Sequence, residues 1–353
     1  MKSNKPLMVV LTGAYGNIGD GVIRRRIFGW VRDLGPIHAY VGNATDDWIE
    51  QLGLSPEDKI YRSADKIAWM KLSVSSTAPA ALILDPGEVP LDRKAFIPEG
   101  IFTALTWMTR LRGGVVVRPP RGVGKSDWAT KAVHRMGVAA SQIALWRNQR
   151  SMDLIRRGEL SPDTAFQEDF TSTGNEERRD LIISLRAARP YPSPAWFETI
   201  RTIQESYGVK VAVASQVRED EPRSRELAAA LGAEYVAWGT AKDLAHEGVL
   251  RARYHNAKIV VSDRLHVLIL AALAGAVPLE IVDRPKDKVA LHFAQIGAPK
   301  VSIDVSDSSV EEMTRFINDA VSGLPNLRMS MESARNSLNN FEQRVRNLVQ
   351  SAG

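Results

Sequence analysis

The feature that most constrains the fold is a repeated alternation of short apolar runs with longer helical stretches. In the first half of the chain the runs lie at residues 7–11, 37–41, 80–84, 114–117 and 141–146. In the second half they lie at residues 181–186, 209–214, 233–238, 259–261 and 279–283. Continuous apolar runs are typical of strands buried on both faces, and strands that alternate with helices form parallel sheets. The sequence therefore predicts an α/β protein.

The alternation is interrupted by polar residues at 171–180 (TSTGNEERRD). A chain of 353 residues is too long for one core of ordinary size, so two domains are expected. We predict an N-terminal Rossmann-like domain at residues 1–172, a linker at 173–180, a C-terminal Rossmann-like domain at 181–325 and a C-terminal amphipathic helix at 326–353.

The predicted C-terminal helix has an apolar stripe with alternating spacings of three and four residues. The stripe consists of Met331, Ala334, Leu338, Phe341, Val345 and Leu348. This spacing is typical of an amphipathic helix. We expect the helix to pack across the domains, and a helix that contacts a membrane surface or forms an oligomer is the alternative.

The composition limits the classes of function. The chain has no cysteine, which excludes disulfides, thiol catalysis and cysteine-held zinc. The first apolar run is too short for a signal peptide or a membrane span, so we expect a soluble, cytoplasmic protein. A net charge of +5 favours acidic ligands or an anionic membrane surface. Nucleic acid is not expected as a partner, because no basic patch is interleaved with aromatic residues.

A glycine-rich loop follows the first predicted strand. Residues 13–20 read GAYGNIGD, with Gly13, Gly16 and Gly19 three residues apart, and this spacing differs from the dinucleotide motif. The loop is either a tight turn that requires positive φ or a ligand loop, since glycine allows close approach and a helix N-terminus favours an anion. Asp20 could cap the next helix or accept hydrogen bonds from a sugar hydroxyl.

A second, basic loop is predicted after the fourth strand, at residues 118–126 (RPPRGVGKS). Its Gly-Lys-Ser ending is similar to a phosphate loop of nucleotide-binding enzymes. That motif needs a glycine five positions before Gly124, where this chain has Pro119. We therefore reject a phosphate loop of that type and keep a glycine-bearing basic loop at a strand end.

The stretch at residues 259–275 predicts a buried strand followed by a buried helix, and Arg264 and His266 lie at the junction. Ligands bind at this edge of parallel sheets, and a helix N-terminus presents N–H groups to an anion. The plain alternative is that Arg264 pairs with an acid such as Asp263 and that His266 is structural. Residues two apart point in roughly opposite directions on a helix. A shared site therefore requires Arg264 and His266 to lie in the turn or in the first residues of the helix.

Arginines recur at predicted strand ends or glycine loops: Arg118 or Arg121, Arg186 and Arg264. A guanidinium group binds carboxylate and phosphate bidentately and stays charged. Several of them in both domains favour a small polyanion as ligand, and histidine adds a group that titrates near neutrality. The sequence has no spacing of histidine and acid that would predict a metal site.

At these positions the sequence resembles the polysaccharide pyruvyltransferase family. The resemblance rests on residues 13–20, 146–151 (WRNQRS), 163–166 (DTAF), 183–186 (ISLR) and, above all, 262–266 (SDRLH) with Ala274, Gly275 and Pro278 behind it. It implies two Rossmann-like domains that face a cleft, similar to GT-B glycosyltransferases. It also implies transfer of pyruvate from phosphoenolpyruvate to a saccharide of a cell-surface or extracellular polysaccharide, as a ketal. Phosphoenolpyruvate is then a co-substrate, and no metal or further cofactor is implied.

The resemblance also implies residue roles. Arg186, Arg264 and the backbone of Leu265 would bind phosphoenolpyruvate, and His266 would be the catalytic acid or base. A further lysine matches Lys286 or Lys288, and we prefer Lys288. The acceptor is expected at the glycine-rich loop, at Gly16, Asn17, Gly19 and Asp20.

Two departures from the family pattern fall in the N-terminal half. Residues 85–88 (DPGE) stand where relatives often have two adjacent glycines, and Asn148 stands where they have an aspartate beside the arginine. The acceptor sugar is therefore not specified, nor is it settled whether the acceptor is lipid-linked, which would place the protein at the inner membrane surface. Two alternatives stay open: a GT-B-like glycosyltransferase that uses a nucleotide sugar, and a non-catalytic saccharide-binding relative.

Overall fold

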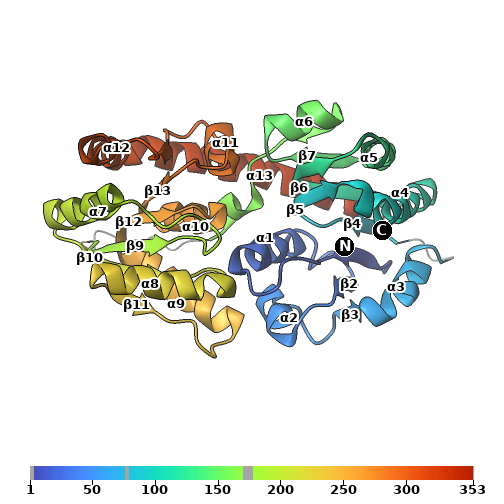
Figure 1. Ribbon diagram of the computed structural model, residues 1–353. Helices are drawn as coiled ribbons and strands as arrows, with labels where there is room; N and C mark the ends of the chain where they lie inside the picture. The colour runs from blue at the N-terminus through green and yellow to red at the C-terminus, as the bar shows by residue number, and fades with distance from the viewer. Residues whose placement is uncertain (1–3, 76–78, 170–177, 353) are drawn as a thin grey trace. The chain divides into compact units, whose positions relative to one another are not determined.

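The computed structural model describes residues 4–75, 79–169 and 178–352. The chain divides into two compact units. Unit 1 comprises Met1–Tyr15, Asp20–Thr164 and Arg335–Gly353, and unit 2 comprises Gly16–Gly19 and Ala165–Ala334. Each unit is a parallel sheet with helices on both of its faces (Figure 1). The predicted α/β class with two Rossmann-like units is therefore confirmed.

The sheet of unit 1 is built around β1 (Leu7–Val10), whose four residues are all buried. Its strand order is β3-β2-β1-β4-β6-β7-β8, with β5 paired to β6, and all of these pairs are parallel. The direction of chain progression reverses between β1 and β4, which makes this the switch point of the sheet. The other bounds are β2 Ile37–Gly42, β3 Lys59–Arg62, β4 Ala81–Ile83, β5 Gly87–Leu91, β6 Val115–Ser126, β7 Ile143–Trp146, β8 Glu159–Leu160, α1 Ile18–Gly29, α2 Asp46–Leu52, α3 Lys66–Ser73, α4 Phe96–Leu111, α5 Trp128–Ala140 and α6 Gln149–Ile155.

Strand β6 corrects one prediction. Residues 118–126 were predicted as a basic loop, but they continue the strand, and Arg118 and Arg121 are buried within it. The two prolines fit because the pairing with β7 is irregular between Arg118 and Arg121. Such a long strand was not readable from the sequence, because proline and glycine within a run normally indicate its end.

Unit 2 has the strand order β11-β10-β9-β12-β13-β14, again with parallel pairs throughout. Its switch point lies between β9 and β12. Most of the linker predicted at 173–180 lies outside the described residues. The bounds are β9 Asp180–Ser184, β10 Lys210–Ala214, β11 Glu234–Val236, β12 Ala257–Ser262, β13 Val277–Val282, β14 Ser302–Asp304, α7 Pro194–Tyr207, α8 Glu221–Leu231, α9 Asp243–Asn256, α10 Leu265–Leu273, α11 Lys288–Gln295, α12 Val310–Ser322 and α13 Leu324–Ala352.

The two faces of the unit 2 sheet are covered by different helices. On one face, side chains of α7, α8 and α12 form a single core cluster with alternate residues of β9, β10, β12 and β13. On the other face, α9 and α10 contact each other and the central strands. Helix α10 is buried along nearly its whole length, as its continuous apolar run predicts. The core thus fixes the end of β12 and the start of α10.

Helix α13 begins in unit 2 and ends in unit 1, with the division between Ala334 and Arg335. Five of the six predicted stripe residues are buried and Leu348 is partly buried. In unit 1 the helix contacts the turn after α1 through the ion pair of Arg346 with Asp33 (2.6 Å). The stripe is therefore used for packing within the chain. In the described part of the chain, no helix is both long enough and apolar enough to cross a membrane.

The packing of α13 predicts a stability difference between two of its positions. Leu338 is 0% exposed and Met329 is 63% exposed. We expect Leu338→Ala to lower the free energy of unfolding by about 2–5 kcal/mol, because it removes buried methyl groups and leaves a cavity. The control Met329→Ala should change it by less than about 0.5 kcal/mol. Urea unfolding of the full chain measures both, and equal, small effects would contradict the packing of the stripe.

Candidate functional site

The junction of β12 and α10 places Arg264 and His266 at the edge of the unit 2 sheet. Arg264 precedes the helix, with φ −105° and ψ 118°, and His266 is the second residue of α10. The N–H of Arg264 donates to Ser262 Oγ (3.0 Å), and Ser262 Oγ donates to the carbonyl of Ser184 in β9 (2.5 Å). A shared site requires both residues to lie in the turn or in the first residues of the helix, and both do. Leu265, between them, is buried.

A buried carboxylate, Asp263, joins the ends of β9 and β12. Its Oδ1 accepts a hydrogen bond from the backbone N–H of Arg186 (3.0 Å). Its Oδ2 accepts one from Arg189 Nε (2.9 Å) and forms an ion pair with Arg186 Nε (3.4 Å). Asp263 therefore organises two arginines that follow β9, and it is not the partner of Arg264.

Arg264 instead pairs with Asp220, which precedes α8. The other carboxylate oxygen of Asp220 accepts from the N–H of Ala187 (3.0 Å). Burial lowers the pKa of Arg264 and raises that of Asp220, because both charges are withdrawn from water, and the pairing offsets part of each shift. The plain alternative, in which Arg264 pairs with an acid such as Asp263, is thus correct in kind, but the acid is Asp220.

Together these groups form a cationic edge at the switch point of unit 2. Arg186 follows β9 and Arg264 follows β12, and these two strands are neighbours in the sheet. Three arginines and two aspartates leave one positive charge in excess. A guanidinium group has five N–H donors, so a carboxylate partner does not use up its capacity. With the N-terminus of α10 at the same edge, the arrangement suits a small anion such as a phosphate.

Part of the glycine-rich loop lies against this edge. Gly16–Gly19 belong to unit 2, where the N–H of Ile18 donates to the carbonyl of Gln216 (3.2 Å) and Asn17 forms a bridge with Val217. A Cβ on residue 19 would lie 2.5 Å from the Cβ and Nδ1 of His266, so only glycine allows this approach. Gly16 has φ +73°, which glycine tolerates. The positive φ of Gly16 fits the tight-turn interpretation, the close approach at Gly19 is to a side chain of the protein, and a ligand role for the loop stays a prediction.

Asp20 lies inside the first turn of α1 and not at its N-cap, so the predicted capping of that helix is not seen. Its Oδ2 accepts from the N–H of Ala14 (3.1 Å), and it lies in unit 1 with Arg24 nearby (3.8 Å). The carbonyl of Asp20 also accepts from Arg24 (2.9 Å). These contacts hold the first part of the loop in shape, and they leave the carboxylate partly exposed.

Two further residues complete the edge of unit 2. Lys288 is the first residue of α11, after β13, and is partly buried, whereas Lys286 is exposed. Glu280 in β13 was not found by sequence reasoning, because a single acid in an apolar strand has no recognisable pattern. It is buried and accepts from Ser302 Oγ (2.6 Å). Burial raises the pKa of Glu280 to about 7, Ser302 opposes the shift, and the nearby charge of Asp263 adds to it.

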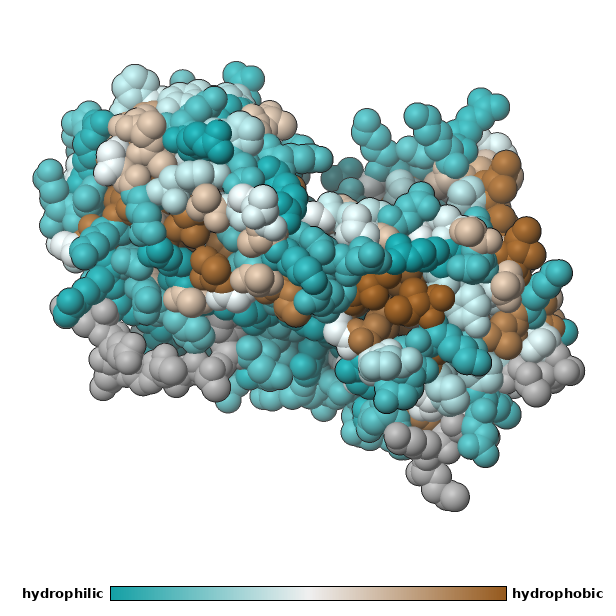
Figure 2. All heavy atoms as spheres, turned by 90° about the horizontal axis from the view of Figure 1, so that it is seen from below, coloured by the Kyte–Doolittle hydropathy of each residue, from teal (hydrophilic) through white to brown (hydrophobic). Residues whose placement is uncertain are grey.

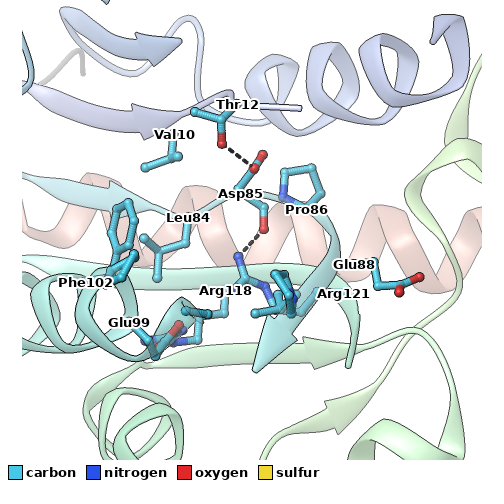
Figure 3. Close-up of a pocket in the computed structure, with 14 residues that line it drawn as sticks. Val10, Thr12, Leu84, Asp85, Pro86, Glu88, Glu99, Phe102, Arg118 and Arg121 are labelled. Atoms are coloured by element: carbon cyan, nitrogen blue, oxygen red, sulfur yellow. Dashed lines mark hydrogen bonds and ion pairs between the residues drawn. The ribbon is translucent and has the colours of Figure 1, made fainter. Parts of the chain in front are cut away.

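Unit 1 has a pocket of about 190 Å³ at its own switch point (Figure 3). Asp85, which follows β4, accepts from Thr12 Oγ1, which follows β1 (2.8 Å), and from a terminal nitrogen of Arg24 (3.3 Å), with which it also forms an ion pair. Burial raises the pKa of Asp85, and Arg24 opposes that shift. Arg121 donates to the backbone carbonyl of Asp85 across the pocket wall.

The rest of this pocket combines buried charge with an apolar wall. Phe102, Leu84 and several prolines and valines supply the apolar part. Glu99 lies 2.8 Å from His134 Nδ1 and 3.7 Å from Arg118. Burial, with the charge of Arg118, lowers the pKa of Arg121 to about 9, so Arg121 stays cationic at neutral pH. Donors, acceptors and an aromatic face around a small volume suit a ring with several hydroxyls.

The described residues contain no group of three histidine, aspartate or glutamate side chains placed to hold a metal ion. The arginines predicted at strand ends come from both units, as expected: Arg186 and Arg264 belong to unit 2, and Arg118 and Arg121 belong to unit 1. Sequence reasoning missed Arg189, Asp220 and Glu280 at the unit 2 edge and Glu99 in the unit 1 pocket.

Comparisons with known proteins give a fold but no family. No protein-family model matches the sequence, and no curated protein matches it. Among solved structures, UDP-GlcNAc 2-epimerase from Neisseria meningitidis bound to UDP-GlcNAc is similar, with 9% identity and a TM-score of 0.60, covering 98% of this chain and 100% of that one.

Two further structures are similar at the same level. One is a putative UDP-N-acetylglucosamine 2-epimerase from Listeria monocytogenes, with 12% identity, a TM-score of 0.54 and coverage of 95% and 91%. The other is the Anabaena protein HepE in complex with UDP and glucose, with 9% identity, a TM-score of 0.54 and coverage of 99% and 100%. At these identities the likeness shows the GT-B-like fold alone.

The raised pKa of Glu280 predicts a pH-dependent stability. Its ordinary value is 4.5 and its folded value is about 7, so the folded state holds a proton that the unfolded state releases between these values. The stabilisation is complete below pH 4.5 and is lost as the pH rises through about 7, amounting to about 3 kcal/mol. Glutamine stays neutral at every pH, so we expect the stability of Glu280→Gln not to fall as the pH rises through this range. Urea unfolding across that range measures it, and parallel pH curves for the two proteins would contradict it.

Proposed function

We propose that this protein transfers pyruvate from phosphoenolpyruvate to a saccharide, forming a pyruvate ketal. One observation carries the proposal: Arg186, Arg264 and His266 lie together at the switch point of the unit 2 sheet. The resemblance of residues 262–266 to pyruvyltransferases supports the same assignment. The GT-B-like fold is compatible with it, although the fold alone specifies no donor.

The donor chemistry fits the cationic edge. Phosphoenolpyruvate carries a phosphate and a carboxylate on one carbon, C2. Arg186 and Arg264 can each bind one of these anions, and fixing both orients C2 for attack. The backbone N–H of Leu265 at the start of α10 adds a donor, and Lys288, the more buried of the two candidate lysines, adds positive charge.

The proton transfers fall to His266. Protonation of C3 makes C2 electrophilic, and a sugar hydroxyl attacks C2 while losing its proton. Phosphate then leaves from C2 with its bonding electron pair, and a second hydroxyl of the same sugar closes the ketal and loses its proton. The two hydroxyl protons balance the proton taken up at C3 and the one that leaves with phosphate. A histidine can give and take protons in these steps at neutral pH.

Two places are candidates for binding the acceptor: the glycine-rich loop, as the resemblance implies, and, independently of it, the unit 1 pocket. Arg121 and Arg118 would donate to sugar hydroxyls, Asp85 and Glu99 would accept from them, and Phe102 would pack against the C–H face of the ring. Gly16, Asn17 and Gly19 of the loop would hold the reacting hydroxyls near His266, because Gly19 contacts that side chain. Asp20 would act through the shape of the loop.

A second candidate is an enzyme that uses a nucleotide sugar, such as a glycosyltransferase. The structural neighbours favour it, because two of the three were solved with UDP-GlcNAc or with UDP and glucose. A nucleoside diphosphate could bind the same arginines through its phosphates. The two candidates differ in the leaving group, which is inorganic phosphate for phosphoenolpyruvate and a nucleotide for a nucleotide sugar.

The proposal predicts phosphate release from phosphoenolpyruvate with a panel of saccharide and lipid-linked acceptors. His266→Ala should lower kcat by about 10²–10⁴-fold, because a positioned acid–base group contributes that much. Its affinity for phosphoenolpyruvate should be largely unchanged. His255→Ala, at the opposite end of β12, is the matched control and should keep full activity. No release with any acceptor, together with UDP release from a UDP-sugar, would favour the second candidate.

Arg264→Ala should act on donor binding more than on the chemical step. Losing one charge-assisted contact is expected to weaken phosphoenolpyruvate binding by about tenfold or more. Calorimetric titration measures the affinity for phosphoenolpyruvate. The midpoint of unfolding checks that the variant, in which Asp220 has lost its partner, is still folded. The control is Arg253→Ala, because Arg253 pairs with Glu234 away from this edge. Equal affinities for wild type and Arg264→Ala would remove Arg264 from the donor site.

A further inference from the structure

Helix α4 carries large apolar side chains on its outer face as well as on its inner one. Ile97 and Leu111 are 72% and 78% exposed, and Trp107 and Met108 are exposed between them. The inner face of the same helix is mixed: Leu105 is buried in the unit 1 core, Ile101 and Phe102 pack against that core, and Glu99, Thr103, Thr106 and Thr109 are also buried. A surface helix normally keeps its large apolar side chains on the core side and has polar side chains on the outside. The outward face of α4 is therefore an unusual exposed surface.

The neighbouring helices extend this surface. On α5, Trp128 is 81% exposed, and Ala132 and Met136 follow at intervals of four residues, so all three lie on one side. On α3, Ile67 is exposed. Helix α4 contacts both α3 and α5, and the three stand in a row along one side of the unit 1 sheet (Figure 1). Figure 2 shows hydrophobic atoms gathered along the right-hand edge, where Figure 1 places α3 and α4. We call this the α3–α5 face, defined by Ile67, Ile97, Trp107, Met108, Leu111, Trp128 and Met136.

The charges around the α3–α5 face are mostly positive. The three helices contain one acidic residue, Glu99, which is buried in the pocket. They contain five basic residues: Lys66, Lys71, Arg110, Lys131 and Arg135. Arg93, Lys94 and Arg112 flank α4. Asp92 and Asp127 precede helices as N-caps, and Asp65 precedes α3. The surface thus combines exposed tryptophan and aliphatic side chains with a basic fringe.

We infer that the α3–α5 face docks on an anionic membrane surface. Tryptophan prefers the interface between lipid headgroups and acyl chains, and long basic side chains reach from there to the headgroup phosphates. Charge complementarity selects this occupant over a second copy of the chain. In a twofold dimer the same surface meets itself, so the basic fringe would face a basic fringe.

Docking in this way would also place the unit 1 pocket close to the membrane surface. Helix α4 carries exposed Ile97 on its outer side and Glu99 and Phe102 of the pocket on its inner side. If the proposed function holds, the acceptor pocket would lie within one helix diameter, about 10 Å, of the bilayer surface. This distance suits a saccharide carried on a membrane lipid. The docking itself does not depend on the proposed function.

Flotation of the full-length protein with vesicles tests the inference. We expect wild type to float with vesicles of phosphatidylcholine and phosphatidylglycerol, and to float less with phosphatidylcholine alone or in high salt. Ile97→Ser with Trp128→Ser should lower binding to the anionic vesicles by about tenfold or more, since two inserted apolar side chains are lost. The matched control is Met329→Ser, an exposed methionine in unit 2, which should bind as wild type does.

Three results would overturn the inference. They are no recovery of wild type with anionic vesicles, equal binding of wild type and the double variant, and equal binding to neutral and anionic vesicles. Light scattering of the same proteins gives a fourth: a wild-type dimer that the double variant loses would assign the face to a second copy. Turnover of donor and acceptor is not measured, so failure here leaves the proposed function untouched.

Discussion

The carboxylate of Asp263 is the contact on which the unit 2 site depends. It is buried at the end of β12, and it binds the backbone and side chain of Arg186 together with the side chain of Arg189. Without it, two guanidinium groups would stand side by side at a sheet edge with only like charge between them, and removing one partner of such a network is strongly destabilising. Asp263 thus allows the sheet to hold excess positive charge at its switch point, where an anionic donor would bind.

The two units share one architecture but carry different polar and charged groups at the same place in the sheet. Each places polar residues where the direction of its sheet reverses, with Arg186 and Arg264 in unit 2 and Thr12 and Asp85 in unit 1. In unit 2 the groups are cationic and arranged for a small anion. In unit 1 acidic and basic groups stand together and are bordered by apolar side chains. The GT-B-like fold of the structural neighbours accommodates both arrangements, so the side chains, rather than the fold, separate the candidate functions.

The sequence predicted what depends on local pattern and missed what depends on distant pairing. Apolar runs gave the strands, and the change from strand to helix period placed Arg264 and His266 at their junction. The pairing of Arg264 with Asp220 spans 44 residues and that of Arg186 with Asp263 spans 77, and no spacing rule joins such positions. Arg118 and Arg121 were placed in a loop because Pro119 and Pro120 hid the continuation of β6. Helix periodicity identified apolar positions, but it could not show that several large apolar side chains of α4 are exposed.

The most direct test of the account is a crystal structure of the protein grown with phosphoenolpyruvate. The account predicts that the phosphate and the carboxylate lie between the ends of β9 and β12, within hydrogen-bond distance of Arg186 and Arg264, with C3 facing His266. Binding of phosphoenolpyruvate elsewhere would contradict it. So would a crystal grown with both ligands in which the diphosphate of a nucleotide sugar occupies this edge and phosphoenolpyruvate is absent.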